Sequence, residues 1–385
     1  MHNFGTLYRY EIKKMLGRKL TLIVLIAVFG LLLAVNAAEY VAVRRAPECN
    51  DDAIAGRAID DSLLDDMREG ITPNIVTDSL GNTEIKDVSY NDSAYRNLFG
   101  YLLKCCGNNT RAYNADEAQL KKTFNEIIDH AYEEYRLTDD ETAYWEARRT
   151  GLSDLPVYDK NAGWSNAIVN LYMANFFMLI TIGATMSGLF ADEYSLRTDA
   201  IVFASSNGKR RLSPVKLLAG CTVGLAEAVL IILGMAGLEF ALYGPVDPEA
   251  SIRLVYGPTV LDMPVKKAFL VCAGIMLVIS LFYSVFAMLL SQVFRNTTAP
   301  LAIMAVMLIC SMLNPPNSYR VLSQIASYLP ATFPGSWTFT DYRLISLAGL
   351  RLNIIQVMPV LYSVLIIILS ILTGISYSRT QIKAR

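Results

Sequence analysis

One short stretch of this sequence places a glycine beside a lysine, as phosphate-binding loops do: Asn207-Gly208-Lys209-Arg210. A phosphate-binding loop also needs an earlier glycine and a serine or threonine directly after the lysine. Consecutive backbone N–H groups and that hydroxyl hold the phosphates and Mg²⁺. Both features are missing here. We therefore expect that the chain does not bind ATP through a P-loop of its own.

The other reactive side chains form no catalytic or metal-binding set. The two histidines, His2 and His130, stand apart, and no cysteine spacing matches a metal site. We therefore expect no catalytic residue and no metal ligand. A disulfide from Cys49 to Cys105 or Cys106 stays open, because a sequence does not supply the Cα separation it needs. Three acidic pairs fit a solvated surface better than a calcium loop; they are Asp51-Asp52, Asp60-Asp61 and Asp65-Asp66.

Two carboxylates fall inside one apolar segment, Glu227 near its middle and Glu239 near its end. A charged group at the centre of a bilayer costs about 2.5 kcal/mol or more, so it usually faces a protein interior or a wet path. Glu227, together with Asn170 and Asn175, is a candidate lining of a substrate conduit. An equally open alternative is that Glu227 is a protonated or amide-bonded packing residue.

These residues belong to long apolar segments that alternate with charged ones. The chain has 385 residues, of which 53% are hydrophobic, and a net charge of −1. This composition excludes an ordinary soluble protein, and it offers no basic face for a nucleic acid. About 20 apolar residues are enough for a helix to cross a bilayer. We predict an all-α polytopic membrane protein with six transmembrane helices, at residues 20–43, 165–189, 214–243, 265–293, 299–313 and 352–375.

Two of these spans have features that bear on their ends. Pro214 suits the first turn of the third span, where a missing backbone N–H is tolerated. The fifth span, residues 299–313, is short for a full crossing.

In the second span, the small residues Gly183, Ser187 and Gly188 favour close contact between helices.

The charge distribution predicts the orientation. Residues 1–19 are predicted to form an amphipathic helix in the membrane interface. Basic residues before the first span and at the chain end place both termini in the cytoplasm, with the spans in the cytoplasmic membrane. Two alternatives stay open for this start: a solvated helical lead-in, and a signal peptide that is cleaved near residue 37.

Two polar regions are predicted to lie outside. Residues 44–164 form a mainly helical extracytoplasmic domain, with helices at 58–67, 95–103 and 117–135. Turns are predicted at Thr72-Pro73-Asn74, Leu80-Gly81-Asn82 and Cys106-Gly107-Asn108-Asn109. Residues 314–351 are rich in aromatics and proline and are predicted to form short helices on or in the outer leaflet.

Residues 190–216 form a predicted cytoplasmic loop that begins with acids and ends with bases. It contains Phe190-Ala191-Asp192-Glu193, then Arg197-Thr198, then Ala204-Ser205-Ser206-Asn207-Gly208-Lys209-Arg210, and then Pro214-Val215-Lys216-Leu217-Leu218. The whole layout outside residues 44–164 resembles the permease subunits of ABC-2 type transporters. In that family this loop forms a coupling helix in a groove of the ATPase subunit. Arg197 departs from the glycine that many members carry.

The resemblance implies a partner ATPase that supplies ATP and Mg²⁺, and a second permease as homodimer or heterodimer. It implies an exporter, with residues 1–19 as an elbow helix and 314–351 as a re-entrant hairpin. The implied contacts or braces of the coupling helix are Glu193, Arg197, Thr198, Asp199, Ser205, Lys209 and Arg210. The basic triplet that starts at Lys209 fits anchoring at anionic headgroups as well.

Two functions from other classes stay open. The first is a membrane-anchored sensor whose extracytoplasmic domain binds a ligand. The second is a carrier driven by protons through Glu227, which is weaker because the chain shows no inverted repeat. A membrane enzyme is the weakest reading, and no pattern names a substrate.

Overall fold

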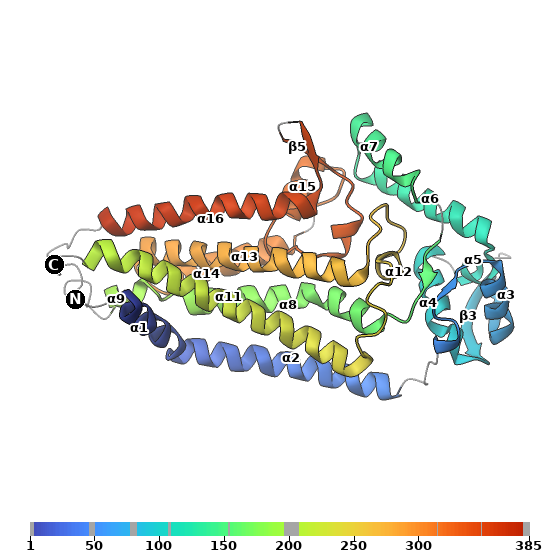
Figure 1. The fold of residues 1–385 in the computed structure, drawn as a ribbon, viewed down its shortest axis with the longest axis horizontal. Helices are drawn as coiled ribbons and strands as arrows, with labels where there is room; N and C mark the ends of the chain where they lie inside the picture. Colours follow the sequence, from blue (N-terminus) through green and yellow to red (C-terminus); the bar gives the residue numbers. More distant parts are fainter. Residues whose placement is uncertain are drawn as a thin grey trace.

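The long helices lie side by side and form a bundle with a smaller, separate region at one end (Figure 1). The structure is a computed structural model, and it describes residues 4–45, 51–77, 83–106, 109–152, 155–195, 208–313, 315–347 and 349–379. Both marked chain ends lie at the opposite end of the bundle (Figure 1). The mostly helical fold expected from the sequence is therefore confirmed.

Within the described ranges, five helices are long and apolar enough to cross a membrane. They are α2 (Lys19–Arg45), α8 (Ala162–Met186), α11 (Gly208–Tyr243), α13 (Val265–Phe294) and α16 (Ile354–Arg379). The predicted fifth span corresponds to α14 (Thr298–Ser311), an apolar helix of only 14 residues. A count of six spans therefore stays a prediction.

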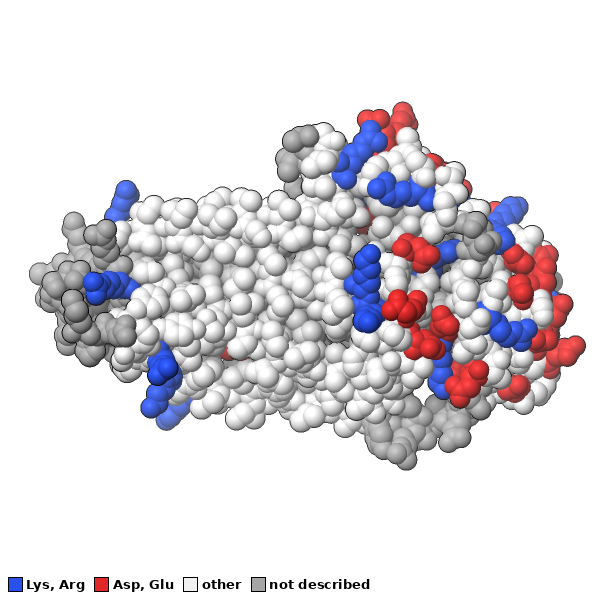
Figure 2. All heavy atoms as spheres, viewed as in Figure 1, with Lys and Arg blue, Asp and Glu red and all other residues white. Residues whose placement is uncertain are grey.

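Charge is distributed as a bilayer requires. On the face in Figure 2, almost no charged side chain lies over the long helices, whereas charged side chains gather at both ends. The visible charges at the end near the chain termini are Lys and Arg, and the opposite end carries both signs (Figure 2). A wide uncharged band between charged ends is the surface that a hydrocarbon layer accommodates.

The prediction that Pro214 opens its helix is wrong. Helix α11 begins at Gly208, so Pro214 lies inside it. Lysine and arginine are good helix formers, and the basic residues before the proline extend the helix. The proline then removes one intrahelical bond close to the helix start, where its cost is smallest.

The bundle depends on small residues where helices approach closely. Gly224 of α11 lies against α13, so a β-carbon there would come within 2.1 Å of Ser284 Oγ. Gly163 of α8 lies against the end of α11, where a β-carbon would be 1.9 Å from the carbonyl oxygen of Gly244. These two glycines differ from the residues named by the sequence prediction, Gly183, Ser187 and Gly188; at Gly183 the nearest atom to an added β-carbon is 3.4 Å away, in Met304.

The bundle is preceded by helix α1 (Phe4–Leu16), the predicted interfacial helix. Its inner face packs on α11, where Met15 and Glu11 are both buried. The hydroxyl of Tyr8 donates to Thr222 of α11 at 2.8 Å. Part of the face expected to meet lipid therefore meets protein.

The separate region contains most of residues 51–158 and has its own buried core. Three of its helices lie close to the predicted segments: α3 (Asp61–Gly70), α4 (Arg96–Cys106) and α6 (Glu117–Glu134). It also contains α5 (Asn109–Asn114), α7 (Asp139–Arg149), the short segments η1 (Asp51–Ala53) and η2 (Ser93–Tyr95), and the strand pair β1 (Arg57–Ala58) and β4 (Val157–Tyr158). The thiols of Cys105 and Cys106 are free and buried. Cys49 lies outside the described residues, so its pairing is not tested.

A hairpin replaces one predicted turn. Thr72-Pro73-Asn74 lies within strand β2 (Ile71–Thr77), which pairs with β3 (Thr83–Tyr90) in antiparallel register. The turn prediction at these three residues is therefore wrong. Pro73 is tolerated because both strands of a two-stranded ribbon are edge strands, so its missing N–H can face outward. The predicted turn at Leu80-Gly81-Asn82 falls outside the described residues.

The segment after α14 combines short elements. It contains α15 (Arg320–Ser327), η3 (Ser336–Phe339) and the hairpin of β5 (Ile345–Leu347) and β6 (Leu350–Leu352). The loop between α11 and α13 adds α12 (Arg253–Tyr256). The expected short helix is present, but the hairpin was not predicted.

The close contact at Gly163 predicts a substitution effect. We expect Gly163→Ala to lower the free energy of unfolding by about 1–3 kcal/mol, because the backbone of Gly244 must move to make room. Gly237→Ala is the matched control, since it adds the same methyl group to α11 where nothing lies within 4 Å. Thermal unfolding in detergent measures both, and equal midpoints for the two variants would contradict the packing argument.

Candidate functional site

A buried ion pair lies at the base of the loop 190–216. Glu193 belongs to the short helix α9 (Ala191–Ser195), and its carboxylate lies 2.6 Å from the ammonium of Lys216 in α11. Lys216 is 0% exposed and Glu193 is 4% exposed. Lys216 also donates to the carbonyl of Leu189 at 3.0 Å, and the Tyr377 hydroxyl of α16 donates to Glu193 at 3.4 Å. The pair therefore joins α9 to two long helices.

The ring of Phe190 covers this pair. The Lys216 ammonium lies 4.9 Å from the ring centre, a distance at which a cation is attracted to the face of an aromatic ring. The rings of Phe190 and Tyr377 are 5.4 Å apart. The phenylalanine at the end of the second apolar segment is thus a wall of the charged site.

Helix α13 holds the same short helix from another side. The Ser291 hydroxyl accepts hydrogen bonds from the backbone N–H groups of Phe190 and Ala191, at 3.2 and 3.0 Å. The Gln292 amide donates to the Tyr194 hydroxyl at 3.0 Å. These bonds satisfy N–H groups at the start of α9 that would otherwise lack partners.

The junction of α1 and α2 supplies a fourth attachment. Arg18 pairs with Asp192 at 3.1 Å and donates to the carbonyl of Thr185 at 3.0 Å. Its guanidinium lies over Gly188, where a β-carbon would come within 1.7 Å of it. The close neighbour of Gly188 is therefore the end of an arginine side chain, whereas the sequence suggested contact between helices.

A second carboxylate lies near Lys216. Glu11 of α1 is 3% exposed. Burial raises the pKa of Glu11 above its ordinary value, and the positive charges of Lys216 and Lys14 oppose that rise. The single buried ammonium of Lys216 thus acts on carboxylates from both α1 and α9.

Of the predicted coupling residues, only Glu193 has a described side chain. The burial of Glu193 favours a role in bracing the loop over a direct contact with a partner protein. Arg197, Thr198, Asp199 and Ser205 lie outside the described residues. Lys209 and Arg210 lie in α11, but their side chains are not described. No sequence pattern predicted that Lys216, Arg18 or Ser291 would hold the start of this loop in place. For Lys216, its position at the start of a long apolar run was a usable signal.

The polar residues within the bundle are bonded to neighbouring elements. Glu227 is 3% exposed, and one of its oxygens accepts a bond from the Thr185 hydroxyl at 2.7 Å. Its other oxygen has no hydrogen-bond partner among the described residues. Asn170 donates to Glu239 at 2.6 Å, and Asn175 donates to the carbonyls of Pro330 and Phe333 at 2.7 Å each. These bonds fit the packing role well, and the conduit role of Glu227 stays a prediction.

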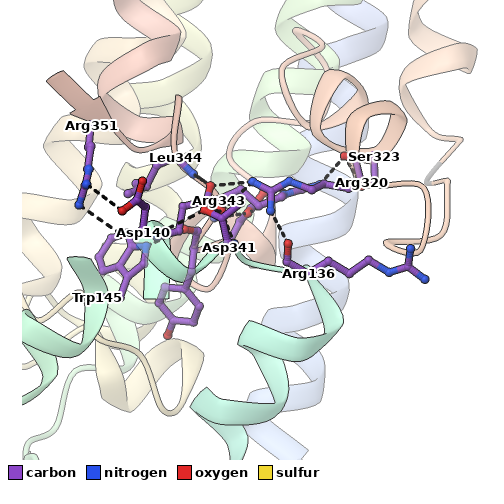
Figure 3. Close-up of polar contacts among 12 residues, drawn as sticks. Arg136, Asp140, Trp145, Arg320, Ser323, Asp341, Arg343, Leu344 and Arg351 are labelled. Carbon is purple, nitrogen blue, oxygen red and sulfur yellow. Dashed lines mark hydrogen bonds and ion pairs between the residues drawn. The ribbon is translucent and has the colours of Figure 1, made fainter. Parts of the chain in front are cut away.

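At the opposite end of the bundle, helix α7 is joined to the segment after α14. The guanidinium of Arg320 lies 2.7 Å from both carboxylate oxygens of Glu141. Glu141 also accepts from the backbone N–H of Leu344 and of Thr138, each at 2.8 Å. Arg320 donates further to the carbonyl of Arg136 at the end of α6 (Figure 3).

A second ion pair lies beside the first. Arg343 and Asp341 are 2.6 Å apart and both are buried. Arg343 also donates to the Ser323 hydroxyl at 2.6 Å (Figure 3). The indole N–H of Trp145 donates to the carbonyl of Tyr342 at 2.5 Å. The polar region and the segment 315–347 therefore share one bonded interface.

The Lys216–Glu193 pair predicts an asymmetric response to substitution. We expect Lys216→Met to lower the free energy of unfolding by about 3–5 kcal/mol, because it leaves a buried carboxylate without its cation. The double variant Lys216→Met with Glu193→Gln should lose less than the sum of the two single variants. Arg211→Met is the control on the same helix, since Arg211 is exposed. Additive effects in thermal unfolding would show that the pair is not coupled.

The interface between Glu141 and Arg320 predicts a dependence on pH. Burial by itself raises the pKa of Glu141, but hydrogen bonds from Arg320, Leu344 and Thr138 outweigh burial and hold the pKa below the usual 4.5. A carboxyl with a lowered pKa in the folded state stabilises the protein above its unfolded pKa, and this stabilisation is lost as the pH falls through the folded value.

We therefore expect Glu141→Gln to lower the unfolding temperature at neutral pH, and the difference from the unchanged protein to shrink below pH 4.5. Asp140→Asn is the control, because Asp140 is 87% exposed and its distance to Arg351 is 3.5 Å. A constant difference between Glu141→Gln and the unchanged protein across this pH range would contradict the assignment.

Comparison of the chain with protein-family models, with curated proteins and with solved structures gave no match. We therefore infer function from the geometry at the two ends of the bundle and from the sequence of the loop 190–216.

Proposed function

We propose that the chain is the permease subunit of an ABC-2 type transporter, which exports a substrate across the cytoplasmic membrane with energy from a separate ATPase. The observation that carries this proposal is the buried Lys216–Glu193 pair at the base of the loop 190–216. A loop that a partner protein moves must be fixed rigidly to the helices that respond.

The attachments at α9 meet that requirement. Lys216 connects α9 to α11, Tyr377 connects it to α16, and Ser291 connects the residues at its start to α13. Arg18 adds the junction of α1 and α2. A force on residues 196–207 would thus reach five helices through short, buried or part-buried contacts.

The energy source is proposed to lie outside the chain. The sequence lacks the glycine and hydroxyl residues of a P-loop around Gly208-Lys209-Arg210. ATP and Mg²⁺ are therefore proposed to act in a partner ATPase that binds the loop, with Arg197, Thr198, Asp199 and Ser205 as contacts. A second permease, identical or similar, would complete the path.

The orientation follows from where charge lies. Helix α9 and both chain ends lie at the same end of the bundle (Figure 1), and the Lys and Arg side chains visible there support a cytoplasmic location (Figure 2). The mixed-charge region at the other end is then extracytoplasmic. The exposed apolar residues of α15, Val321, Leu322 and Ile325, fit contact with the outer leaflet.

Co-purification with ATPases tests the proposal. The chain is coexpressed with candidate ABC ATPases, and each complex is measured for composition and ATP hydrolysis. We expect the double charge reversal Arg197→Glu with Asp199→Arg to abolish complex formation without changing the unfolding temperature. The control, Glu193→Gln, should lower the unfolding temperature because it weakens the buried pair.

Two results would contradict the proposal. One is that no ATPase is retained although the chain is folded. The other is that the double reversal leaves both binding and hydrolysis unchanged. A folded chain that binds an external ligand but no ATPase would favour the sensor, the alternative function from the sequence.

A further inference from the structure

A cleft of about 640 Å³ opens between the polar region and the segment after α14. One wall is the end of α6, at Glu133, Glu134, Tyr135 and Arg136, and the other includes α15 and Trp337. Small-molecule sites commonly measure roughly 300–1,000 Å³. The volume is therefore suitable for a small organic ligand.

Two aromatic side chains belong to the walls. Tyr135 is partly buried, and burial raises the pKa of its hydroxyl to about 12, so the ring stays neutral near pH 7. The guanidinium of Arg343 lies 4.8 Å from the centre of the Tyr135 ring, which shows that this ring already attracts a cation. Trp337, whose ring offers the strongest face for a cation, lines the same cleft.

The acids at the cleft favour positive charge. The side chains of Glu133 and Glu134 are exposed, and neither pairs with a lysine or arginine among the described residues. Helix α6 ends at Glu134, so its carbonyl groups add the negative end of the helix dipole. Glu134 accepts a bond from Asn317 at 2.7 Å, which places its carboxylate toward the opposite wall.

The two arginines at the cleft do not form an anion site. Arg343 donates to Asp341, to Ser323 and to the carbonyl of Arg320, so each of its three nitrogens already makes a hydrogen bond and its charge is balanced by Asp341. The carbonyl of Arg136 accepts a hydrogen bond from Arg320, and the side chain of Arg136 points away from these bonded residues (Figure 3). At this cleft, the carboxylates of Glu133 and Glu134 and the negative end of α6 are therefore opposed by one positive charge, that of Arg136.

We propose that this cleft binds an organic ammonium ion, quaternary or protonated, with Glu133 and Glu134 supplying the opposite charge and Tyr135 and Trp337 the apolar walls. Carboxylates attract the ammonium over distance, and ring faces select a cation with an apolar surface. The site does not depend on transport, because it needs only the joined outer elements.

The ammonium group can come from two sources. The cleft adjoins α15, whose exposed apolar face fits the outer leaflet, so the ammonium of a lipid headgroup could enter it. A free ammonium compound outside the membrane could enter as well.

Binding of labelled choline to the full chain in maltoside detergent tests the site. We expect saturable binding that tetramethylammonium displaces and that dimethylbutanol, the neutral isostere of choline, does not. The double variant Glu133→Gln with Glu134→Gln should weaken binding about tenfold, which corresponds to 1.4 kcal/mol. Trp337→Ala should weaken it similarly, whereas Trp337→Phe should retain part of it.

Arg136→Gln is the matched control, since it removes the opposite charge from the same wall. It should leave choline binding unchanged or strengthen it. The proposal is overturned if choline does not bind, if the isostere competes equally, or if Arg136→Gln weakens binding while the glutamate variants do not. Unfolding temperatures of all variants show that each one is folded.

Nanodiscs separate the two sources. If the ligand is a lipid headgroup, choline should bind less tightly in phosphatidylcholine than in phosphatidylglycerol discs, and the glutamate variants should remove that difference. Equal affinity in both discs assigns the cleft to a free ammonium compound.

Discussion

The buried pair of Lys216 and Glu193 is the interaction on which the end of the bundle near α9 depends. Burying an ammonium and a carboxylate costs several kcal/mol for each ion, and only close geometry with further hydrogen bonds recovers that cost. Here the carbonyl of Leu189, the hydroxyl of Tyr377 and the ring of Phe190 complete the surroundings. The ends of α8, α11 and α16 must therefore stay in register, and the loop 190–216 begins from a rigid base.

The opposite end of the bundle, next to the polar region, uses ion pairs of arginine in the same way. The ion pair Arg320–Glu141 and the bond from Arg320 to the carbonyl of Arg136 connect α7 and the end of α6 to the segment after α14. The pair Arg343–Asp341 lies within that segment. Arginine suits this role because its planar donors bond two oxygens at once and reach backbone carbonyls as well. Because elements of the polar region and of the bundle are joined in this way, the cleft at Tyr135 and Trp337 has walls from both, and any motion of one wall would change its shape.

Local pattern was sufficient for elements whose signal is long or periodic. The five long apolar helices and the helices α4 and α6 lie close to their predicted ranges, because hydrophobic length and helical spacing act within one segment. The hairpin of β2 and β3 was not predicted, because Thr72-Pro73-Asn74 resembles a turn and because strand pairing depends on a partner elsewhere in the chain. The start of α11 was misplaced because Pro214 is a helix-start signal only when no helix already precedes it.

Hydropathy and charge segregation, which are properties of the chain alone, were enough to predict apolar helices long enough to cross a membrane, with charge gathered at their ends. They also pointed to the loop 190–216. Which charges meet was decided by the packed helices. Tyr377 and Glu193 are 184 positions apart, and Arg18 reaches Asp192 across 174. Such contacts depend on the rotation and depth of each helix against its neighbours, which are set by close packing at glycines such as Gly163 and Gly224. A one-dimensional pattern carries no record of that geometry.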